Sequence, residues 1–342
     1  MQYVRFKDYI KPGASSLILG AIITLVLWYD LYLPIGLSEC QGENLCLGDS
    51  PLVDFFLNSA YIRSWRGILF SFIFLLAIAF LMIQLNERFS FINVRTVLPA
   101  YIFCIVYSIF YFPHGFSVSL LVVLFVLGAI YFSFKMVDMP YMEMSVYAFN
   151  TGLLLSLATI FSLPCLFYTI PILIFFYVCK AMSLRNILAL FFGICLPILY
   201  LLIYLAYVND LEAFLLFVSS SSTIGVFSSY ASLQWWDWSY LIVYTTIFVL
   251  GLLNYSKWRG QLNVRNREEH FFILIYFLFT LLLLFVFAID VELIFPLLFL
   301  FASFTVGQYF SMVFSLFSKI VGILFIVVSL LLFSQRIIFS IC

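Results

Sequence analysis

The sequence predicts an all-α fold: a single polytopic bundle of about eleven transmembrane helices that occupies residues 1–342. Three observations support this prediction. Hydrophobic residues make up 65% of the chain and charged residues only 9%, whereas about 25% of the residues of a typical soluble domain are charged. The apolar residues form long continuous runs, as in membrane-spanning helices, and lack the alternation of barrel strands. The basic residues, finally, fall almost entirely in alternate loops.

The composition excludes several classes of protein. A water-soluble domain of this size could not bury so much apolar surface, because a large part of any folded surface faces solvent. A disordered chain would carry far fewer apolar residues. The 16 Lys and Arg residues balance the 16 Asp and Glu residues, so there is no net positive charge for nucleic-acid binding. The expected partners are the lipid bilayer and another membrane protein.

Eleven segments are apolar enough to form transmembrane helices, each of which needs roughly 20 mainly apolar residues. They are residues 15–33, 66–85, 97–112, 118–134, 146–161, 163–180, 184–207, 239–255, 271–289, 292–309 and 319–335. Pro164 and Pro171 interrupt the tract 146–180, which is interpreted either as two short helices or as one broken helix. The first segment is predicted to be a retained helix, since no small-residue cleavage site of a signal peptide follows it.

The distribution of basic residues predicts the orientation of the helices. With the N-terminus in the cytoplasm, all but three of the 16 Lys and Arg residues fall on the cytoplasmic side. The three exceptions are Arg63, Arg66 and Arg336. The chain is therefore expected to begin inside and to end outside. Trp28 and Trp238 are among the aromatic residues near predicted helix ends, as in the aromatic belts of membrane proteins.

The ionisable residues of greatest interest lie in the segments that this orientation places outside, close to the membrane surface. Asp30 ends the first helix, and Arg63 and Arg66 open the second. Two arginines there could hold a phosphate or pyrophosphate group while a nearby carboxylate acts as a general base. The alternative is structural. Both arginines then extend to lipid headgroups or pair with acidic residues of the same loop, and Asp30 is simply solvated.

Four further positions on the outer side are candidates for a functional role. His114 stands in a tight turn. Asp237 lies among three Trp residues, which either pack on a sugar ring together with it or merely anchor the helix at the interface. Asp290 and Glu292 lie in the short turn between the ninth and tenth helices. They form part either of a proton or cation path or of a solvated turn.

Cysteine, histidine and metal chemistry receives little support from the sequence. Cys40 and Cys46 share the first outside loop, where they either form a disulfide bond or remain free thiols. The two histidines, His114 and His270, fall on opposite sides of the membrane, and His270 ends a basic segment, 256–270, that is predicted to be a solvated loop. The chain has no Walker A phosphate loop and no GxSxG or HExxH motif. We therefore expect no metal and no cofactor.

Several short strings follow one another in a characteristic order between about residues 15 and 335. They are LNERF at 85–89, LPA at 98–100, the apolar run 118–135, the stretch 147–173, Arg185-Asn186, and DVELIFP at 290–296. This order resembles an uncharacterised family of multi-pass inner-membrane proteins found in Bacteroidota. The resemblance implies a location in the bacterial inner membrane. Some members carry a carotene-oxygenase name, but those enzymes hold iron with four histidines and this chain has two.

The tract 146–207 is also distantly similar to the membrane core of glycosyltransferases that use polyprenyl-phosphate-linked sugars. That similarity implies a catalytic acidic residue just after the first helix, where Asp30 stands in this chain. The enzymes often place a second acidic residue beside the first, whereas Leu31 follows Asp30 here. A polyprenyl-phosphate lipid is therefore added to the expected partners.

Three hypotheses for the function follow. The first is an envelope-assembly or accessory subunit of the inner membrane that has no chemistry of its own. The second is a glycosyltransferase at the periplasmic face, with Asp30 as the base and with Arg63 and Arg66 on the phosphate of a polyprenyl-phosphate-linked sugar. The third is a transporter of small solutes or ions that depends on Asp290 or Glu292.

Overall fold

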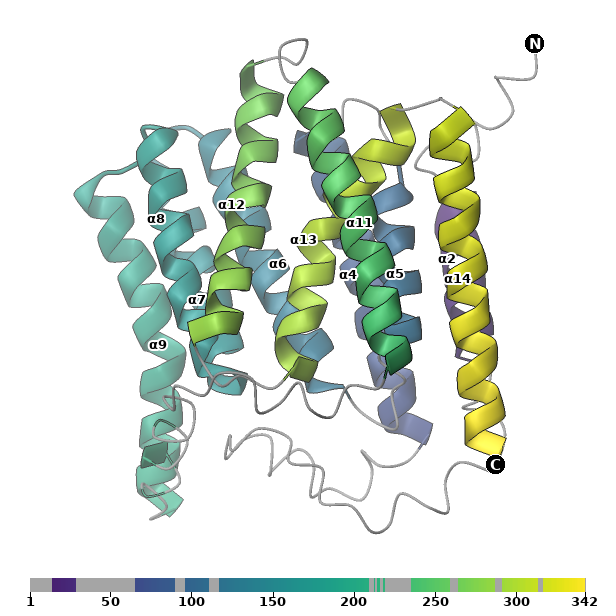
Figure 1. Ribbon diagram of the computed structural model, residues 1–342. Coiled ribbons are helices and arrows are strands. Elements are labelled where there is room, and N and C mark those ends of the chain that lie inside the picture. The colour runs from purple at the N-terminus through teal and green to yellow at the C-terminus, as the bar shows by residue number, and fades with distance from the viewer. Residues whose placement is uncertain are drawn as a thin grey trace.

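The computed structural model describes residues 14–28, 65–89, 96–110, 117–208, 212, 214, 215, 218, 235–258, 264–286, 291–312 and 316–341. Apart from short turns this part of the chain is helical, and it contains no strand. Its eleven α-helices lie side by side, and each runs in the direction opposite to the one before it (Figure 1). The predicted all-α bundle is therefore confirmed as a fold class.

The helices correspond to the predicted segments one by one. Their bounds are α2 (Ala14–Leu27), α4 (Trp65–Phe89), α5 (Leu98–Phe110), α6 (Val118–Val137), α7 (Met144–Phe161), α8 (Thr169–Val178), α9 (Leu184–Val208), α11 (Trp235–Trp258), α12 (Val264–Val286), α13 (Val291–Met312) and α14 (Leu316–Ile341). A 3₁₀ helix, η3 (Leu163–Tyr168), precedes α8. Within the described residues, α4, α6, α7, α9, α11, α13 and α14 are long and apolar enough to cross a membrane, as in a multi-pass membrane protein.

The tract 146–180 forms two elements that run in opposite directions, so the two-helix interpretation is the correct one. α7 ends at Phe161, and Ser162 after it has an extended backbone with φ −150°. Pro164 then opens η3, because proline has no N–H to continue the hydrogen bonds of α7. Pro171 falls in the first turn of α8, where a missing N–H costs little.

The turn between α8 and α9 is closed by backbone and side-chain hydrogen bonds. Lys180 has φ 55°, and the N–H of Ala181 donates to the carbonyl of Phe176 at 2.9 Å, which ends α8 in a Schellman motif. The side-chain amide of Asn186 donates to the carbonyl of Ala181 at 2.7 Å. Its backbone N–H donates to Ser183 Oγ at 3.3 Å, so Ser183 caps α9. These bonds fix where α9 begins.

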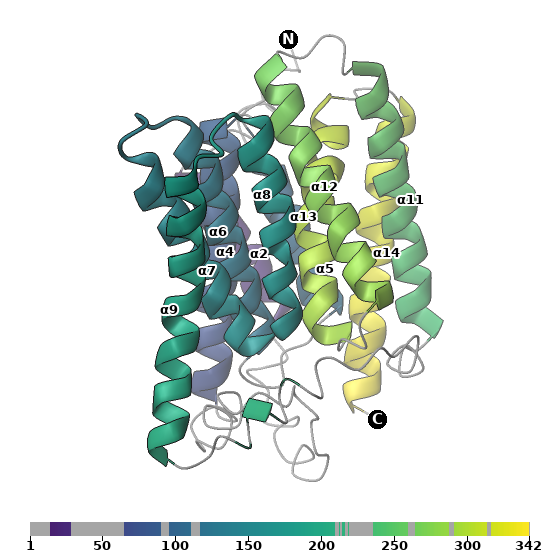
Figure 2. The ribbon, with the colours of Figure 1, turned by 90° about the vertical axis from the view of Figure 1, so that its left-hand side faces the viewer.

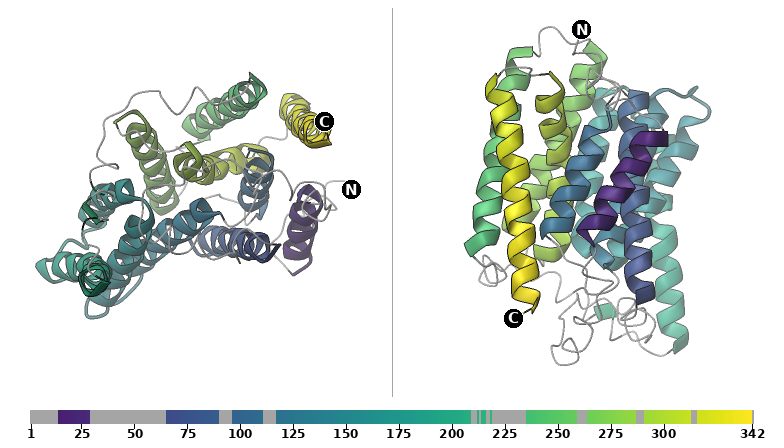
Figure 3. Two further views of the ribbon diagram at one scale, coloured as in Figure 1. Left: turned by 90° about the horizontal axis from the view of Figure 1, so that it is seen from below. Right: turned by 90° about the vertical axis from the view of Figure 1, so that its right-hand side faces the viewer.

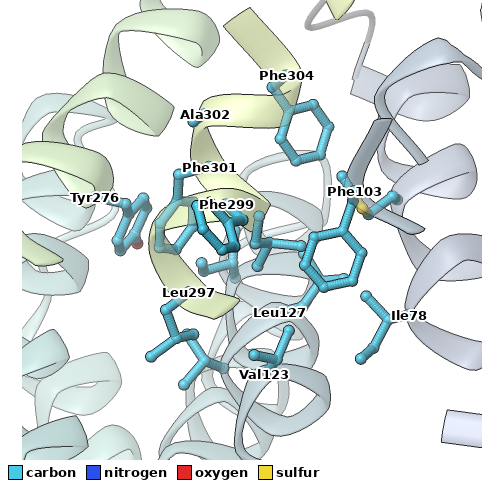
Figure 4. Close-up of a cluster of buried hydrophobic side chains, with 14 of the residues drawn as sticks. Ile78, Phe103, Val123, Leu127, Tyr276, Leu297, Phe299, Phe301, Ala302 and Phe304 are labelled. Atoms are coloured by element: carbon cyan, nitrogen blue, oxygen red, sulfur yellow. The ribbon is translucent and has the colours of Figure 1, made fainter. Parts of the chain in front are cut away.

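α13 forms the centre of the bundle, with α5, α6, α11 and α12 around it (Figure 3). Its side chains meet those of the neighbouring helices in one buried cluster (Figure 4). The cluster includes Ile78 of α4, Phe103 of α5, Val123 and Leu127 of α6, Tyr276 of α12, and Leu297, Phe299, Phe301, Ala302 and Phe304 of α13. In a lipid environment such packing holds helices together by close van der Waals contact rather than by exclusion of water.

α7 and α9 pack unusually closely because a glycine from each helix faces the backbone of the other. A Cβ atom on Gly152 would lie 2.2 Å from the carbonyl oxygen of Leu190. A Cβ atom on Gly193 would lie 2.3 Å from the carbonyl oxygen of Phe149. The two helices run in the same direction, since η3 and α8 return the chain between them (Figure 2). α9 lies at one flank of the bundle and α14 at the other (Figure 1).

The basic side chains that the structure describes all lie at one end of the bundle, the upper end in Figure 1, which we name the basic end. They are Arg88, Lys135, Lys180, Arg185, Lys257, Arg267 and Lys319. Each stands at the start or the end of a helix or in the turn beside one. The bundle is thus electrostatically asymmetric along the direction of its helices.

Candidate functional site

The structure describes only part of the predicted site. Outside the described residues lie Asp30, Cys40, Cys46, Arg63, His114 and Asp290. The backbone is described, but the side chain is not, for Arg66 in α4, Asp237 in α11 and Glu292 in α13. Each of these three residues stands in the first turn of its helix, and Figure 1 shows that the three helices start at the same end of the bundle.

Trp28 fixes the end of α2 to its neighbours, two residues before Asp30. Its ring is only 2% exposed, and its indole N–H donates to Ser108 Oγ of α5 at 2.9 Å. The ring also meets the edge of Phe72 of α4 at a centroid distance of 5.7 Å. The expected place of Trp28 in an aromatic belt is therefore wrong, because the side chain points into the bundle. Trp238, the other example, is exposed as expected.

A group of four hydroxyl side chains joins α4, α5 and α6 at this same end. We name Ser71, Tyr107, Ser117 and Ser119 the hydroxyl cluster. Ser117 Oγ is hydrogen-bonded to the hydroxyl of Tyr107 at 2.7 Å and to Ser119 Oγ at 2.8 Å. The backbone N–H of Ser117 donates to Ser71 Oγ at 2.7 Å. These hydroxyls carry no charge, so they hold the helix ends in place but supply no acid or base by themselves.

The hydroxyl cluster is not predicted by the sequence. Single serines in an apolar run usually bond to the preceding turn of their own helix, as Ser108 does to the carbonyl of Cys104 at 2.7 Å. The one usable signal was the pair Ser117 and Ser119 at the start of an apolar run, where a serine commonly caps a helix. Ser71, from another helix, has no comparable signal.

A second polar contact lies deeper in the bundle and links η3 to α12. The hydroxyl groups of Tyr168 and Thr280 are hydrogen-bonded to each other. Thr280 also bonds to the carbonyl of Tyr276 at 2.7 Å, and the ring of Tyr276 stacks on Phe301 of α13 at 5.7 Å. These contacts satisfy buried hydroxyls and lock neighbouring helices together, which is a structural role.

His270 is buried rather than part of a solvated loop, because α12 already begins at Val264. The imidazole ring lies on the ring of Tyr255 of α11, with 4.3 Å between the centroids. The hydroxyl of Tyr255 donates to the carbonyl of Arg267 at 3.2 Å, and Glu269 beside His270 is buried as well. The predicted loop 256–270 is thus corrected at its C-terminal half. In the described part of the chain, no three His, Cys, Asp or Glu side chains could share a metal ion.

No protein family, characterised protein or solved structure matches this chain. The function is therefore inferred from the side chains that the bundle gathers or exposes.

The two flanks of the bundle expose different side chains. On α9, Tyr200, Tyr204 and Tyr207 follow one another at helical spacing, and we name them the tyrosine face. Tyr200 is 65% exposed and Tyr207 is 86% exposed. Among the side chains of α14 that the structure describes, the large exposed hydrophobic ones are all aliphatic: Ile320, Ile323, Leu324, Ile326, Val327, Leu330 and Leu331. α9 exposes aliphatic side chains as well, such as Leu199 and Ile203, but has the tyrosines in addition. Aliphatic side chains suit lipid tails, whereas a row of phenols brings hydroxyl groups to the surface.

Proposed function

We propose that this protein is an accessory or envelope-assembly subunit of the bacterial inner membrane, and that the tyrosine face of α9 contacts a partner membrane protein. The exposed phenol groups of α9 are the observation that carries the proposal. We also place the basic end in the cytoplasm, as the positive-inside rule requires, so that α9 ends at the periplasmic side.

The depth of Tyr200 supports a protein partner. α9 has 25 residues and is therefore about 37 Å long, longer than the roughly 30 Å of a bilayer's hydrocarbon core. Tyr200 is four residues past the middle residue, Leu196, or about 6 Å from the middle of the helix. Side chains of a helix lean toward its N-terminus, which for Tyr200 means toward the membrane centre. Its hydroxyl group therefore lies among lipid tails unless another protein covers it.

A hydroxyl group in hydrocarbon needs a hydrogen-bond partner. Within the described residues, no hydrogen bond reaches the hydroxyl of Tyr200 or that of Tyr204. Leaving such a group unbonded costs about 4 kcal/mol on a hydrocarbon scale, whereas a bond to a neighbouring helix contributes about 1 kcal/mol. A helix of another protein that offers carbonyl or side-chain acceptors is the occupant that fits this face.

We expect the double variant Tyr200→Phe/Tyr204→Phe to bind its partner about tenfold more weakly, because two hydrogen bonds of about 0.6–1 kcal/mol each are lost. The measurement is native mass spectrometry of the protein gently extracted from its own membrane. Tyr177→Phe, which changes an exposed phenol on α8, is the matched control and should keep the partner. A wild-type protein that carries no protein partner would contradict the proposal, and a bound polyprenyl-phosphate lipid instead would favour a transferase.

The transferase hypothesis also has an observation in its favour. Trp28 and the hydroxyl cluster hold the ends of α2, α4, α5 and α6 together at one end of the bundle. In the sequence, Asp30 follows Trp28 by two residues, Arg66 stands in the first turn of α4, and His114 lies between α5 and α6. This arrangement would bring a base and a phosphate-binding group from separate loops to the periplasmic face, as transfer from a polyprenyl-phosphate-linked sugar requires.

If that hypothesis is correct, Asp30→Asn should abolish sugar transfer while leaving the amount of protein in the membrane unchanged, since an amide cannot accept the proton. Glycan products of cells that carry only this variant are the measurement. Asp54→Asn, in the predicted outside segment between the first two helices, serves as the control and should leave the products as they are. Unaltered glycans in the Asp30 variant would exclude it as the base.

A further inference from the structure

A groove runs between α7 and α9 at the basic end of the bundle. Its volume is about 620 Å³, and it is open along the outer surface of the two helices. Six apolar side chains line it, together with two polar ones: Val146, Phe149, Leu184, Leu188, Ala189 and Phe192, with Ser145 and Arg185. Figure 2 shows α7 and α9 side by side at this flank. In a membrane, the groove faces lipid along its length and headgroups at the Arg185 end.

Arg185 is the cation at the end of the groove, and its guanidinium group is exposed. Among the described residues its hydrogen bond is to Met142 Sδ at 3.8 Å, and a thioether is a weak acceptor. Most of its five N–H donors are therefore available to a ligand. A guanidinium group presents paired donors that match the oxygens of a phosphate group.

The charges around Arg185 favour an anion. Two other basic residues lie at this end, Lys135 in the last turn of α6 and Lys180 in the turn before α9. Asp138 and Glu143, between α6 and α7, are acidic, so these five residues carry one positive charge in excess. The ammonium group of Lys135 lies over the ring of Tyr147 at 5.1 Å, so that charge is held close to α7. In addition, α7 and α9 run parallel and both begin here, so the positive ends of two helix dipoles point the same way.

We propose that this groove binds an anionic phospholipid of the cytoplasmic leaflet. The phosphate group of the lipid accepts hydrogen bonds from Arg185, and one acyl chain lies along Val146, Phe149 and Phe192. An apolar groove with an available guanidinium group at the headgroup level matches a lipid at both of its ends, whereas a soluble phosphate would leave the apolar walls uncovered. The site lies at the opposite end of α9 from the tyrosine face. It does not depend on a protein partner there, but its assignment to the cytoplasmic leaflet rests on the proposed orientation.

The test compares phosphatidylglycerol with phosphatidylcholine in nanodiscs of the full-length protein, with bound lipids counted by native mass spectrometry. The wild-type protein should prefer phosphatidylglycerol about fivefold, as one basic side chain at a membrane surface allows. Arg185→Gln should lose that preference. Lys319→Gln, which removes an exposed charge from the first turn of α14 at the same end, should retain it.

A second variant tests the groove itself. Val146 is exposed at the rim, so Val146→Trp should fill the groove without disturbing the core and should reduce the binding of both lipids. Three outcomes would overturn the proposal: an undiminished preference in Arg185→Gln, an equal loss of preference in Lys319→Gln, or normal lipid binding by Val146→Trp. Binding of free glycerol phosphate as tight as that of phosphatidylglycerol would also overturn it, since the acyl chain would then contribute nothing.

Discussion

Replacing Gly193 with alanine is expected to separate α9 from α7 and to destabilise the protein by about 3 kcal/mol or more. The added Cβ atom would lie 2.3 Å from the carbonyl oxygen of Phe149 and 2.9 Å from the backbone nitrogen of Leu153. Both atoms belong to the backbone of α7, so no side chain can turn away to make room. The helices must move apart, and close helix approach through small residues is the main source of affinity between helices in a membrane.

The matched control is Gly322→Ala in α14. The nearest atom to its added Cβ would be a ring carbon of Phe310 at 3.4 Å, an ordinary contact. Alanine is favoured over glycine in a helix by about 1 kcal/mol, so this variant should be as stable as the wild type or slightly more so. Thermal unfolding in detergent, followed by circular dichroism, measures both. An unchanged melting temperature for Gly193→Ala would mean that α7 and α9 lie farther apart than the structure shows.

The second large effect is expected from Asn86→Asp, which should cost about 3 kcal/mol. Asn86 is fully buried near the end of α4, and its side-chain N–H donates to the carbonyl of Thr96 at 2.9 Å, just before α5. An aspartate has no N–H to donate. If ionised, it places a negative charge against the carbonyl oxygen in a site that water does not reach. If it takes up a proton instead, the protonation costs free energy at neutral pH.

Asn254→Asp provides the comparison, because Asn254 stands near the end of α11, at the same end of the bundle, and is only half-buried. A charge there can be solvated, so we expect a loss of less than about 1 kcal/mol. The free energy of unfolding of both variants can be compared in mixed micelles at increasing denaturant. Equal losses would show that the hydrogen bond from Asn86 to Thr96 does not contribute measurably to the free energy of unfolding.

The positions of the helices could be predicted from the sequence because a long apolar run is a local property of the chain. Each predicted segment contains a helix, but the ends differ where a helix continues beyond the apolar run. α12 begins at Val264, seven residues before the predicted segment 271–289, because charged residues can extend a helix into the headgroup layer. Hydropathy therefore marks where a helix meets lipid rather than where the helix begins.

The contacts between helices could not be predicted, because they depend on which helices become neighbours. No local feature of the sequence pairs Gly152 with Gly193. Likewise, nothing in the sequence around Trp28 distinguishes it from an interfacial tryptophan, although α4 and α5 bury it in the folded protein. Lys180 adopts a left-handed backbone conformation that normally indicates glycine. The candidate site likewise combines features that are local in the sequence with contacts that form only in the folded bundle. Its loops were visible in the sequence, whereas the hydroxyl cluster beside them required three helices to meet.

The parallel arrangement of α7 and α9 has a consequence for how the protein is made. Two antiparallel neighbours can enter the bilayer together as a hairpin, but α7 and α9 cannot, because η3 and α8 return the chain between them. During synthesis, Gly152 therefore cannot contact the backbone of α9 until the chain as far as Gly193 has been translated and inserted. The α7–α9 flank is thus expected to assemble only after α9 has been inserted.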